Sequence, residues 1–404
     1  MAVTENDIKT HIKNAFRNQN LLNCEVTLKG TNDTTDGYAS FITFATVSAT
    51  YKDGSKEEIN IAVKVSRESL IQNFRYAYDR EAYLYSTIFP TFTKFQHENQ
   101  VEDLFKSVPI CYKTIADEKL VVIILEDLKQ NGYRLHDRKN PMDLNHLKLV
   151  LREYGKFHAV SFALRHKRKE DFKKLVNNFS DSMINIIDDA WKQMIKESFV
   201  KVCGTMKEIG KLELYEVCNS ILQKDPGDLM LGLLKTDEAQ SAVLHGDCWN
   251  NNFLFKYKVE NNKMFPLQVA IVDWQLARLH SPVLDLSYFL YSTSSEEQLE
   301  RFDELLEGYY SSFSSTIREL GCEPEELYSF TTLKEHWKKY SLFGILMVVF
   351  CLHAMMADKE ETANIDADSE DRIRNFMDME IKNVAEYHKR LVACLGHYKK
   401  YTDT

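Results

Sequence analysis

The sequence predicts an α+β fold in two lobes, a β-rich N-terminal lobe over residues 1–128 and a mainly helical C-terminal lobe over 129–404. Three observations lead to this expectation. A length of 404 residues favours more than one structural unit. Alternating β-branched and aromatic residues dominate the N-terminal third, and helical periodicity dominates the remainder. The boundary that the pattern offers is the polar, turn-prone segment after Leu128.

Composition excludes several classes of partner. The net charge of -9 argues against nucleic acid, because phosphate binding needs a basic face. The most apolar run, residues 343–357, is shorter than the ~20 residues that span a bilayer, so we expect a buried core helix and no membrane insertion. The polar, acidic start of the chain is unlike a signal or transit peptide. Eight scattered cysteines without a C-x-x-C pair favour reduced thiols in a cytoplasmic protein.

The N-terminal lobe begins with a helix expected over residues 4–20, where Thr4 is a suitable cap and Asp7 stands three positions later. Strands follow in order, and the hairpin turn at 52–55 separates the second from the third. The expected strands cover residues 24–30, 38–51 and 58–66.

From residue 69 the helical period returns and is expected to end at Pro90. A further hairpin is expected over 108–113 and 120–125. The second half is predicted to be helical over 144–164, 170–225 and 296–400. Its one β-like patch is the stretch around 243–255 and 269–272.

That patch carries the most specific chemistry. His245-Gly246-Asp247, then Asn252 and Asp273, stand in loops beside short apolar strands, so the three polar side chains are expected to meet. An Asp that accepts a proton, with an Asn and an Asp that hold a metal, is what phosphoryl transfer from ATP requires. Zinc binding by His245, Asp247 and Cys248 is a weaker interpretation, because these three do not converge in a turn. Cys248 is more readily a bystander thiol than a nucleophile.

Lys64 stands in an otherwise apolar strand, where a lysine usually faces solvent. Glu81 follows on the expected helix, and a strand lysine paired with a helix glutamate holds the α- and β-phosphates of a nucleotide. Asp79 and Arg80 compete for the same position on that helix. Glu81 is preferred because neighbouring apolar residues set it near the buried face.

Other candidates are less specific. Gly37-Tyr38-Ala39-Ser40 is either a loop that covers phosphates, with the Ser40 hydroxyl as a donor, or a plain turn. The segment from Glu126 to Leu128 is either a solvated strand end or a linker whose backbone reads adenine. His158 is expected to be a core histidine. Asp285 is either a carboxylate that braces a loop or a helix N-cap.

These residues resemble the protein-kinase-like phosphotransferases that act on small molecules, the choline kinase and aminoglycoside phosphotransferase group. The hallmark H-G-D-x-x-x-x-N followed by I-x-D-W is matched at His245–Asn252 and Ile271–Trp274. Within the group the chain is most similar to the ecdysteroid kinase-like family. Further matching segments are residues 37–40, 62–64, 125–128, 157–159, 244–252, 273–275 and 282–286.

The resemblance implies a protein-kinase-like two-lobed fold, with ATP and Mg²⁺ as cofactors. It implies that Asp247 orients or deprotonates the acceptor hydroxyl and that Asn252 and Asp273 hold Mg²⁺. Lys64 is expected to hold phosphates, braced by Glu81. Ser40, Glu126 and Leu128 complete the expected nucleotide site, although the loop before Ser40 departs from a glycine-rich signature. His245 is expected to support the catalytic loop, and Asp285 to brace it from behind.

Three functions remain open on the sequence. The first is a kinase for a steroid alcohol such as an ecdysteroid, favoured by the apolar residues between 330 and 356 if some of them line the cleft. The second is a choline, ethanolamine or broad-specificity xenobiotic kinase, and the acids between 358 and 370 argue in that direction only if they are more than a solvated face. The third is a catalytically silent protein that binds a nucleotide or ligand.

Overall fold

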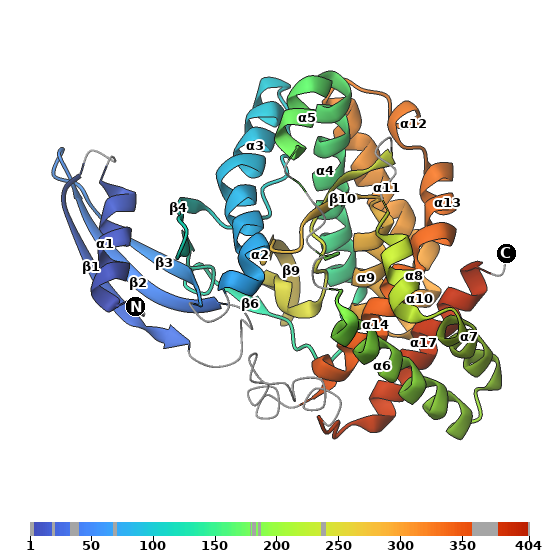
Figure 1. Ribbon diagram of the computed structural model, residues 1–404. Helices are drawn as coiled ribbons and strands as arrows, with labels where there is room; N and C mark the ends of the chain where they lie inside the picture. The colour runs from blue at the N-terminus through green and yellow to red at the C-terminus, as the bar shows by residue number, and fades with distance from the viewer. Residues whose placement is uncertain are drawn as a thin grey trace.

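A computed structural model describes residues 4–17, 21–32, 40–67, 71–177, 179, 183–184, 187–235, 240–357 and 379–402. The sequence candidates Gly37, Tyr38 and Ala39, and the charged run at 358–370, lie outside these residues. The described part combines an N-terminal antiparallel sheet with a larger, mainly helical region, the α+β class expected from sequence. Figure 1 shows the sheet and its helix at one side of the helical mass.

The N-terminal sheet has five antiparallel strands in the order β1-β2-β3-β5-β4. The strands are β1 (Leu21–Asn32), β2 (Ser40–Tyr51), β3 (Lys56–Ser66), β4 (Cys111–Ala116) and β5 (Val121–Glu126). Helix α1 (Glu5–Phe16) covers one face, because Ile8, Ile12 and Phe16 pack on valines and isoleucines of the sheet. Val63 and Val65 point into that core, so Lys64 between them points from the opposite face.

The predicted N-terminal cap of α1 is confirmed. Thr4 Oγ1 accepts a hydrogen bond from the backbone of Asp7 at 3.2 Å, and the Asp7 carboxylate accepts one from the Thr4 backbone at 2.9 Å. Such a reciprocal box satisfies two amides that have no partner inside the helix, which stabilises a helix by about 1 kcal/mol.

The helix expected to end at Pro90 does not end there. Helix α2 (Ile71–Tyr83) passes into a π-helical turn, η1 (Leu84–Ile88), and then into α3 (Phe89–Glu98). Pro90 therefore occupies the first turn of α3, where its missing N–H and its fixed φ cost little. A new α-helix begins after the π-turn, just before Pro90. For this reason the proline, which usually marks the end of a helix, is a misleading signal here.

The helical region is built around the long, mostly buried helix α4 (Leu144–Lys167). The other helices of the described ranges surround it or extend from it (Figure 1). They are α5 (Lys169–Val176), α6 (Asp189–Glu208), α7 (Leu212–Gln223), α8 (Pro226–Leu233), α9 (Val283–Thr293), α10 (Glu296–Glu300), α11 (Phe302–Glu319), α12 (Pro324–Leu327), α13 (Phe330–Tyr340), α14 (Leu342–Met356) and α17 (Val384–Thr402).

The predicted buried helix over 343–357 is confirmed as α14, whose Leu346 and Leu352 have no exposed surface. Among the described residues no helix by itself has the length and apolarity to cross a bilayer. The run from Pro324 to Tyr340 and α14 meet that test only when joined across a 51° bend.

Short strands interrupt the helical region in more places than the sequence indicated. Strands β6 (Tyr133–Leu135), β8 (Phe253–Glu260) and β9 (Lys263–Ile271) form one antiparallel sheet, and β7 (Ala242–Leu244) pairs with β10 (Arg278–His280). The expectation of a single β-like patch is therefore wrong for β6 and β10. Each has only three residues, too few for a period to be recognised, and pairs with a segment far away in the chain.

Candidate active site

The polar residues singled out in the second half of the chain come together at the ends of β7, β8 and β9. Asn252 lies in a 3-10 turn, η3 (Asn250–Asn252), between the Asp247 loop and β8. Its Nδ2 donates to the backbone oxygen of Asp247 at 2.8 Å and to the Asp247 carboxylate at 2.9 Å. Both bonds use the amide nitrogen, so the side-chain oxygen of Asn252 is left for another partner.

Asp273 follows β9 directly and is held beside this loop. The backbone N–H of Val272 donates to the backbone oxygen of Asn252 at 3.0 Å, which fixes the two loops together. Asp273 has φ +63°, a left-handed conformation that a residue other than glycine adopts only at some cost. The chain therefore holds the Asp273 carboxylate where relaxed extended backbone would not put it.

Lys64 reaches the same place from the N-terminal sheet. Its Nζ lies 2.6 Å from the Glu81 carboxylate and 2.8 Å from that of Asp273. Burial alone would lower the pKa of Lys64, but the charges of Asp273 and Glu81 outweigh it and raise the pKa above its usual value. Lys64 is therefore a permanent cation, and its partner Asp273 lies 209 positions away in the sequence.

The Asp247 side chain is half-buried beside Asn252 and Tyr288. Burial, with the negative charge of Asp273, raises the pKa of Asp247 to about 7, against the opposing hydrogen bonds from Asn252 and Tyr288. The Tyr288 hydroxyl, on α9, donates to Asp247 Oδ1 at 3.3 Å. Sequence reasoning missed this contact, because nothing in the spacing of α9 distinguishes Tyr288 from Tyr291.

A buried network holds the backbone of the Asp247 loop. The Asp285 carboxylate accepts the backbone N–H groups of His245 at 2.7 Å and Gly246 at 2.9 Å, and His158 Nε2 lies 3.3 Å away. Although burial opposes ionisation, these hydrogen bonds, led by that from His158, lower the pKa of Asp285. The N-cap of α9 is Pro282, so the alternative interpretation of Asp285 as a helix cap is wrong. His158 is a fully buried, satisfied core histidine, since its Nδ1 lies 3.0 Å from the Tyr309 hydroxyl.

The imidazole of His245 connects the Asp247 loop with the chain just before Asp273. Its Nε2 bonds the backbone oxygen of Val272 at 2.9 Å, and its Nδ1 lies 3.0 Å from the Tyr154 hydroxyl. With Val272 O as acceptor, Nε2 carries the proton, which leaves Nδ1 as an acceptor beside the Tyr154 hydroxyl. Cys248 is also fully buried, and the described residues contain no group of three or more His, Cys, Asp and Glu side chains placed to hold a metal. Zinc binding by His245, Asp247 and Cys248 therefore has no geometric support.

A pocket of about 150 Å³ opens between the sheet and these loops. Its walls include each sequence-selected nucleotide or metal residue, namely Ser40, Lys64, Glu81, Glu126, Leu128, Asn252 and Asp273. Apolar side chains, among them those of Ile42, Ala62, Leu125 and Leu254, contribute much of the remaining wall. Asp247 is not among the lining residues and is joined to them by its hydrogen bond from Asn252.

The linker after β5 offers a backbone edge to this pocket. The N–H of Asp127 donates to Asn60 O at 3.0 Å, and Leu128 O accepts from Tyr133 at 2.9 Å. The N–H of Leu128 makes no hydrogen bond within the described ranges. The Glu126 side chain is turned away, because it accepts from the Ile110 backbone at 2.9 Å and from Asn131 at 2.8 Å.

The donor set suits Mg²⁺. This cation prefers oxygen ligands and usually takes one or two from the protein, with phosphate and water completing its shell. The side-chain oxygen of Asn252 and the second carboxylate oxygen of Asp273, which accept no hydrogen bond from the described residues, are of that kind, on loops joined by a backbone hydrogen bond.

Comparison with known proteins identifies the family of the chain. A family model described as the ecdysteroid kinase-like family matches residues 34–322. No curated protein matches the chain. Among solved structures, a GDP complex of a variant aminoglycoside 2′-phosphotransferase-IIIa is 12% identical, with a TM-score of 0.43, covering 93% of this chain and 95% of the other. A glucosamine kinase is 9% identical, with a TM-score of 0.30, covering 94% and 93%. Because the family model spans well over half of the 404 residues, from the N-terminal sheet through α11, the chain belongs to the ecdysteroid kinase-like family of small-molecule phosphotransferases.

Proposed function

We propose that this protein transfers the γ-phosphate of ATP to a hydroxyl group of an apolar, steroid-sized alcohol such as an ecdysteroid. The observation that carries the phosphoryl-transfer part is the convergence of Asn252, Asp273 and the Lys64–Glu81 pair on one pocket, with Asp247 hydrogen-bonded to Asn252 beside it. Phosphoryl transfer depends on positioning and charge neutralisation more than on covalent chemistry, and this set supplies both.

Each residue has a separate role in the proposal. Lys64, held by Glu81, binds the α- and β-phosphates, and the Leu128 N–H binds the adenine edge. Asn252 and Asp273 hold Mg²⁺, which neutralises phosphate charge when bound. The acceptor oxygen forms a bond to the γ-phosphorus while the bond to the β,γ-bridging oxygen breaks. The hydroxyl proton passes to Asp247, and ADP leaves.

In this proposal the lobes divide after Leu128. Residues 1–128 bind one side of the nucleotide. Residues 129–404 supply the loops of Asp247, Asn252 and Asp273 and the site for the acceptor. The two lobes meet at the Lys64–Asp273 contact and at a backbone hydrogen bond of 2.8 Å from Ile271 to Ser107. The eight free cysteines support a cytoplasmic location.

The wall beside Asp247 supports an apolar acceptor. Tyr288, which contacts Asp247, also lies 3.3 Å from the thiol of Cys351 on α14. Helix α14 is apolar apart from His353, and its Phe350 and Cys351 are half-buried where most of their neighbours are buried. The ring of Phe350 packs on Trp191 at 5.8 Å. A substrate hydroxyl delivered to Asp247 therefore lies against aliphatic, aromatic and sulfur atoms.

The test is an ATP-consumption screen over ecdysteroids, choline, ethanolamine and plant phenolic alcohols, with Asp247→Asn as the matched control. Turnover of sterols that Asp247→Asn abolishes is the expected result. Turnover of choline or ethanolamine alone would favour the polar-substrate alternative. Tight binding of ATP without turnover of any alcohol would favour a silent pseudokinase.

A further inference from the structure

A second pocket, which we name the rear pocket, lies against the nucleotide pocket on the other side of Tyr85. It has a volume of about 530 Å³, within the range of small-molecule sites. Its walls come from η1, from α3 and from the segment 105–111 that leads into β4. Tyr85 and Pro109 line both pockets, so the two cavities share a wall.

The rear pocket is lined mainly by apolar and basic side chains. Its floor is aromatic, since Phe89, Phe92 and Phe105 are 6%, 1% and 4% exposed, and Ile110 is 58% exposed at its edge. The charged or titratable side chains among its lining residues are basic, from Lys94, His97 and Lys106, apart from Tyr85 and the thiol of Cys111. The described residues that line it include no carboxylate. The nearest ion pair, Lys94 with Glu98, is exposed and 3.8 Å long, so it leaves Lys94 free to turn inward.

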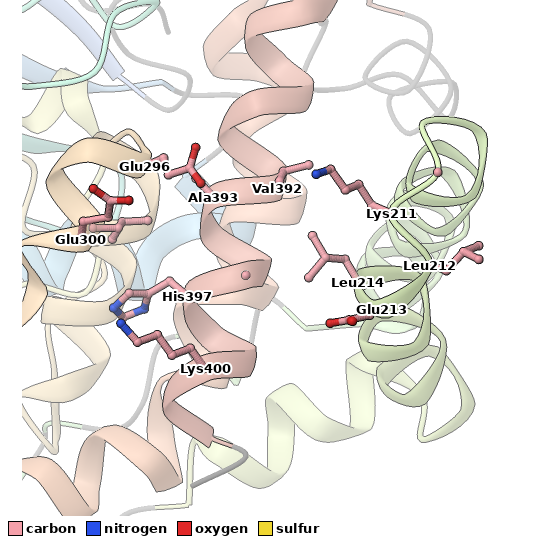
Figure 2. Close-up of a pocket in the computed structure, with 13 residues that line it drawn as sticks. Lys211, Leu212, Glu213, Leu214, Glu296, Glu300, Val392, Ala393, His397 and Lys400 are labelled. Carbon is pink, nitrogen blue, oxygen red and sulfur yellow. The ribbon is translucent and has the colours of Figure 1, made fainter.

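Another cavity of the described structure is lined by charges of both signs. It has a volume of about 560 Å³ and lies between the start of α7, α10 and α17. Figure 2 shows acidic Glu213, Glu296 and Glu300 alternating around it with basic Lys211 and Lys400. Charges of both signs favour no particular ligand charge, so that cavity does not select a class of molecule.

The shared wall carries a second feature that points to a ligand. Tyr85 is 4% exposed, and its hydroxyl is buried with no hydrogen-bond partner in the described part of the chain. Buried hydroxyls are nearly always satisfied, because leaving one without a partner costs free energy. Tyr85 also stands in the π-turn, four positions after Glu81, and π-turns occur frequently at functional sites. A movement of Tyr85 therefore acts on the helix that positions Glu81 against Lys64.

We propose that the rear pocket binds a small apolar molecule bearing one anionic group, and that its occupancy is coupled through Tyr85 to nucleotide affinity. The apolar body fills the aromatic floor, and a carboxylate, sulfate or phosphate ester lies near Lys94, His97 and Lys106. This goes beyond the proposed reaction, because none of the residues placed in the transfer step lines the rear pocket. Free acids and phosphorylated alcohols share this chemistry.

The binding experiment uses a matched pair of fluorescent probes on the full chain. 1-Anilinonaphthalene-8-sulfonate carries one sulfonate, and N-phenyl-1-naphthylamine has the same rings without it. The expected result is that the sulfonate binds with Mg²⁺ and a non-hydrolysable ATP analogue present, and that Lys94→Glu with Lys106→Glu weakens it about fivefold to tenfold. The uncharged probe should be unaffected by that double variant. Lys207→Glu with Lys263→Glu has the same charge change on exposed positions away from the pocket and is the control.

Two further measurements test the location of the site and its coupling to the nucleotide. Thr93→Trp places a large ring in the mouth of the pocket from the exposed side of α3, and it should exclude both probes without lowering the melting temperature. The sulfonate probe should change the affinity for a fluorescent nucleotide, and by linkage the nucleotide should change probe affinity by the same factor. Phosphorylated and carboxylated apolar competitors then distinguish the two sources of ligand.

Equal probe binding by the wild type and the Lys94→Glu, Lys106→Glu variant would overturn the site. Unchanged nucleotide affinity at saturating probe would overturn the coupling. Neither outcome requires phosphate transfer, so failure of the proposed kinase activity would be seen separately, as absent turnover with intact probe binding.

Discussion

The ammonium of Lys64 lies 2.6 Å from the carboxylate of Glu81, in a largely buried pair between the sheet and α2 whose side chains are 14% and 2% exposed. Removing either partner from a buried pair leaves a charge without compensation. The two removals are unequal, because Asp273 stays 2.8 Å from Lys64 when Glu81 is neutralised, whereas removing Lys64 leaves two carboxylates facing each other.

We therefore expect Lys64→Met to lower kcat/KM by about 100-fold and stability by about 3 kcal/mol. Glu81→Gln should lower kcat/KM by about tenfold and stability by about 1 kcal/mol. Steady-state kinetics and urea unfolding measure both effects. An equal loss of activity in the two variants would contradict the bracing role of Glu81.

Tyr288 is expected to position Asp247 for proton transfer. Tyr288→Phe removes the 3.3 Å hydrogen bond to Asp247 while keeping the ring, so kcat should fall about tenfold with KM nearly unchanged. Tyr291→Phe is the matched control, since Tyr291 is on the same helix but its hydroxyl lies 3.1 Å from His397. A similar fall in kcat for both variants would indicate damage to α9 rather than loss of positioning.

Gly246 cannot accept a side chain. It has φ +85°, and a Cβ added there would stand 2.1 Å from the backbone oxygen of Leu276. Gly246→Ala should therefore displace the Asp247 loop, with a loss of about 3 kcal/mol in unfolding free energy and of nearly all turnover.

Gly204 provides the contrast for that measurement. It lies inside α6, and a Cβ added there would meet no described atom within 4 Å, so Gly204→Ala should raise stability by about 0.5–1 kcal/mol. Thermal unfolding of both variants distinguishes a specific steric block from a general intolerance of substitution at glycine.

Two buried histidines should make the fold sensitive to acid. Burial lowers the pKa of His353 to about 4 and that of His397 to about 3. Below the ordinary value near 6.5 the unfolded chain binds a proton at each site and the folded chain does not. The unfolded state then holds more protons, so stability is present above pH 6.5 and is lost as the pH falls from 6.5 towards 4.

At pH 5 each histidine should lower the free energy of unfolding by about 1–2 kcal/mol relative to its value at neutral pH. His397→Phe keeps an aromatic ring beside Phe302 and Trp337 and removes the titration, so it should lose less stability than the wild type between pH 7.5 and pH 5. Urea unfolding at the two pH values gives this difference. The same loss in wild type and variant would show that His397 is not responsible.

Local chemistry accounts for what the sequence could predict. The Thr4–Asp7 box and the hairpin at 52–55 depend on residues a few positions apart, and the strands around Lys64 follow from their own alternation. The H-G-D and D-W motifs identify the loops because each is short and bounded by apolar strands. The lobe boundary and the roles of the site residues stay predictions until the variants above are measured.

What the sequence could not predict depends on distant partners. Tyr154 meets His245 from 91 positions away, and Tyr288 meets Asp247 from 41. Both are ordinary apolar-face tyrosines in sequence. The π-turn was missed for a different reason, since Pro90 gives a strong local stop signal and only the packing around Phe89 and Trp274, with ring centres 4.8 Å apart, shows that the helix continues.

The π-turn also sets a length requirement on the chain. One extra residue is accommodated between Leu84 and Ile88, and an α-helix turns by about 100° per residue. Deleting one residue there would restore regular helix and rotate everything before it relative to α3 by roughly that angle. Glu81 would then face away from Lys64 while the aromatic packing of α3 stayed intact. The π-turn therefore sets the rotation of α2 about the helix axis relative to α3. In this region insertions and deletions should be tolerated far less than substitutions.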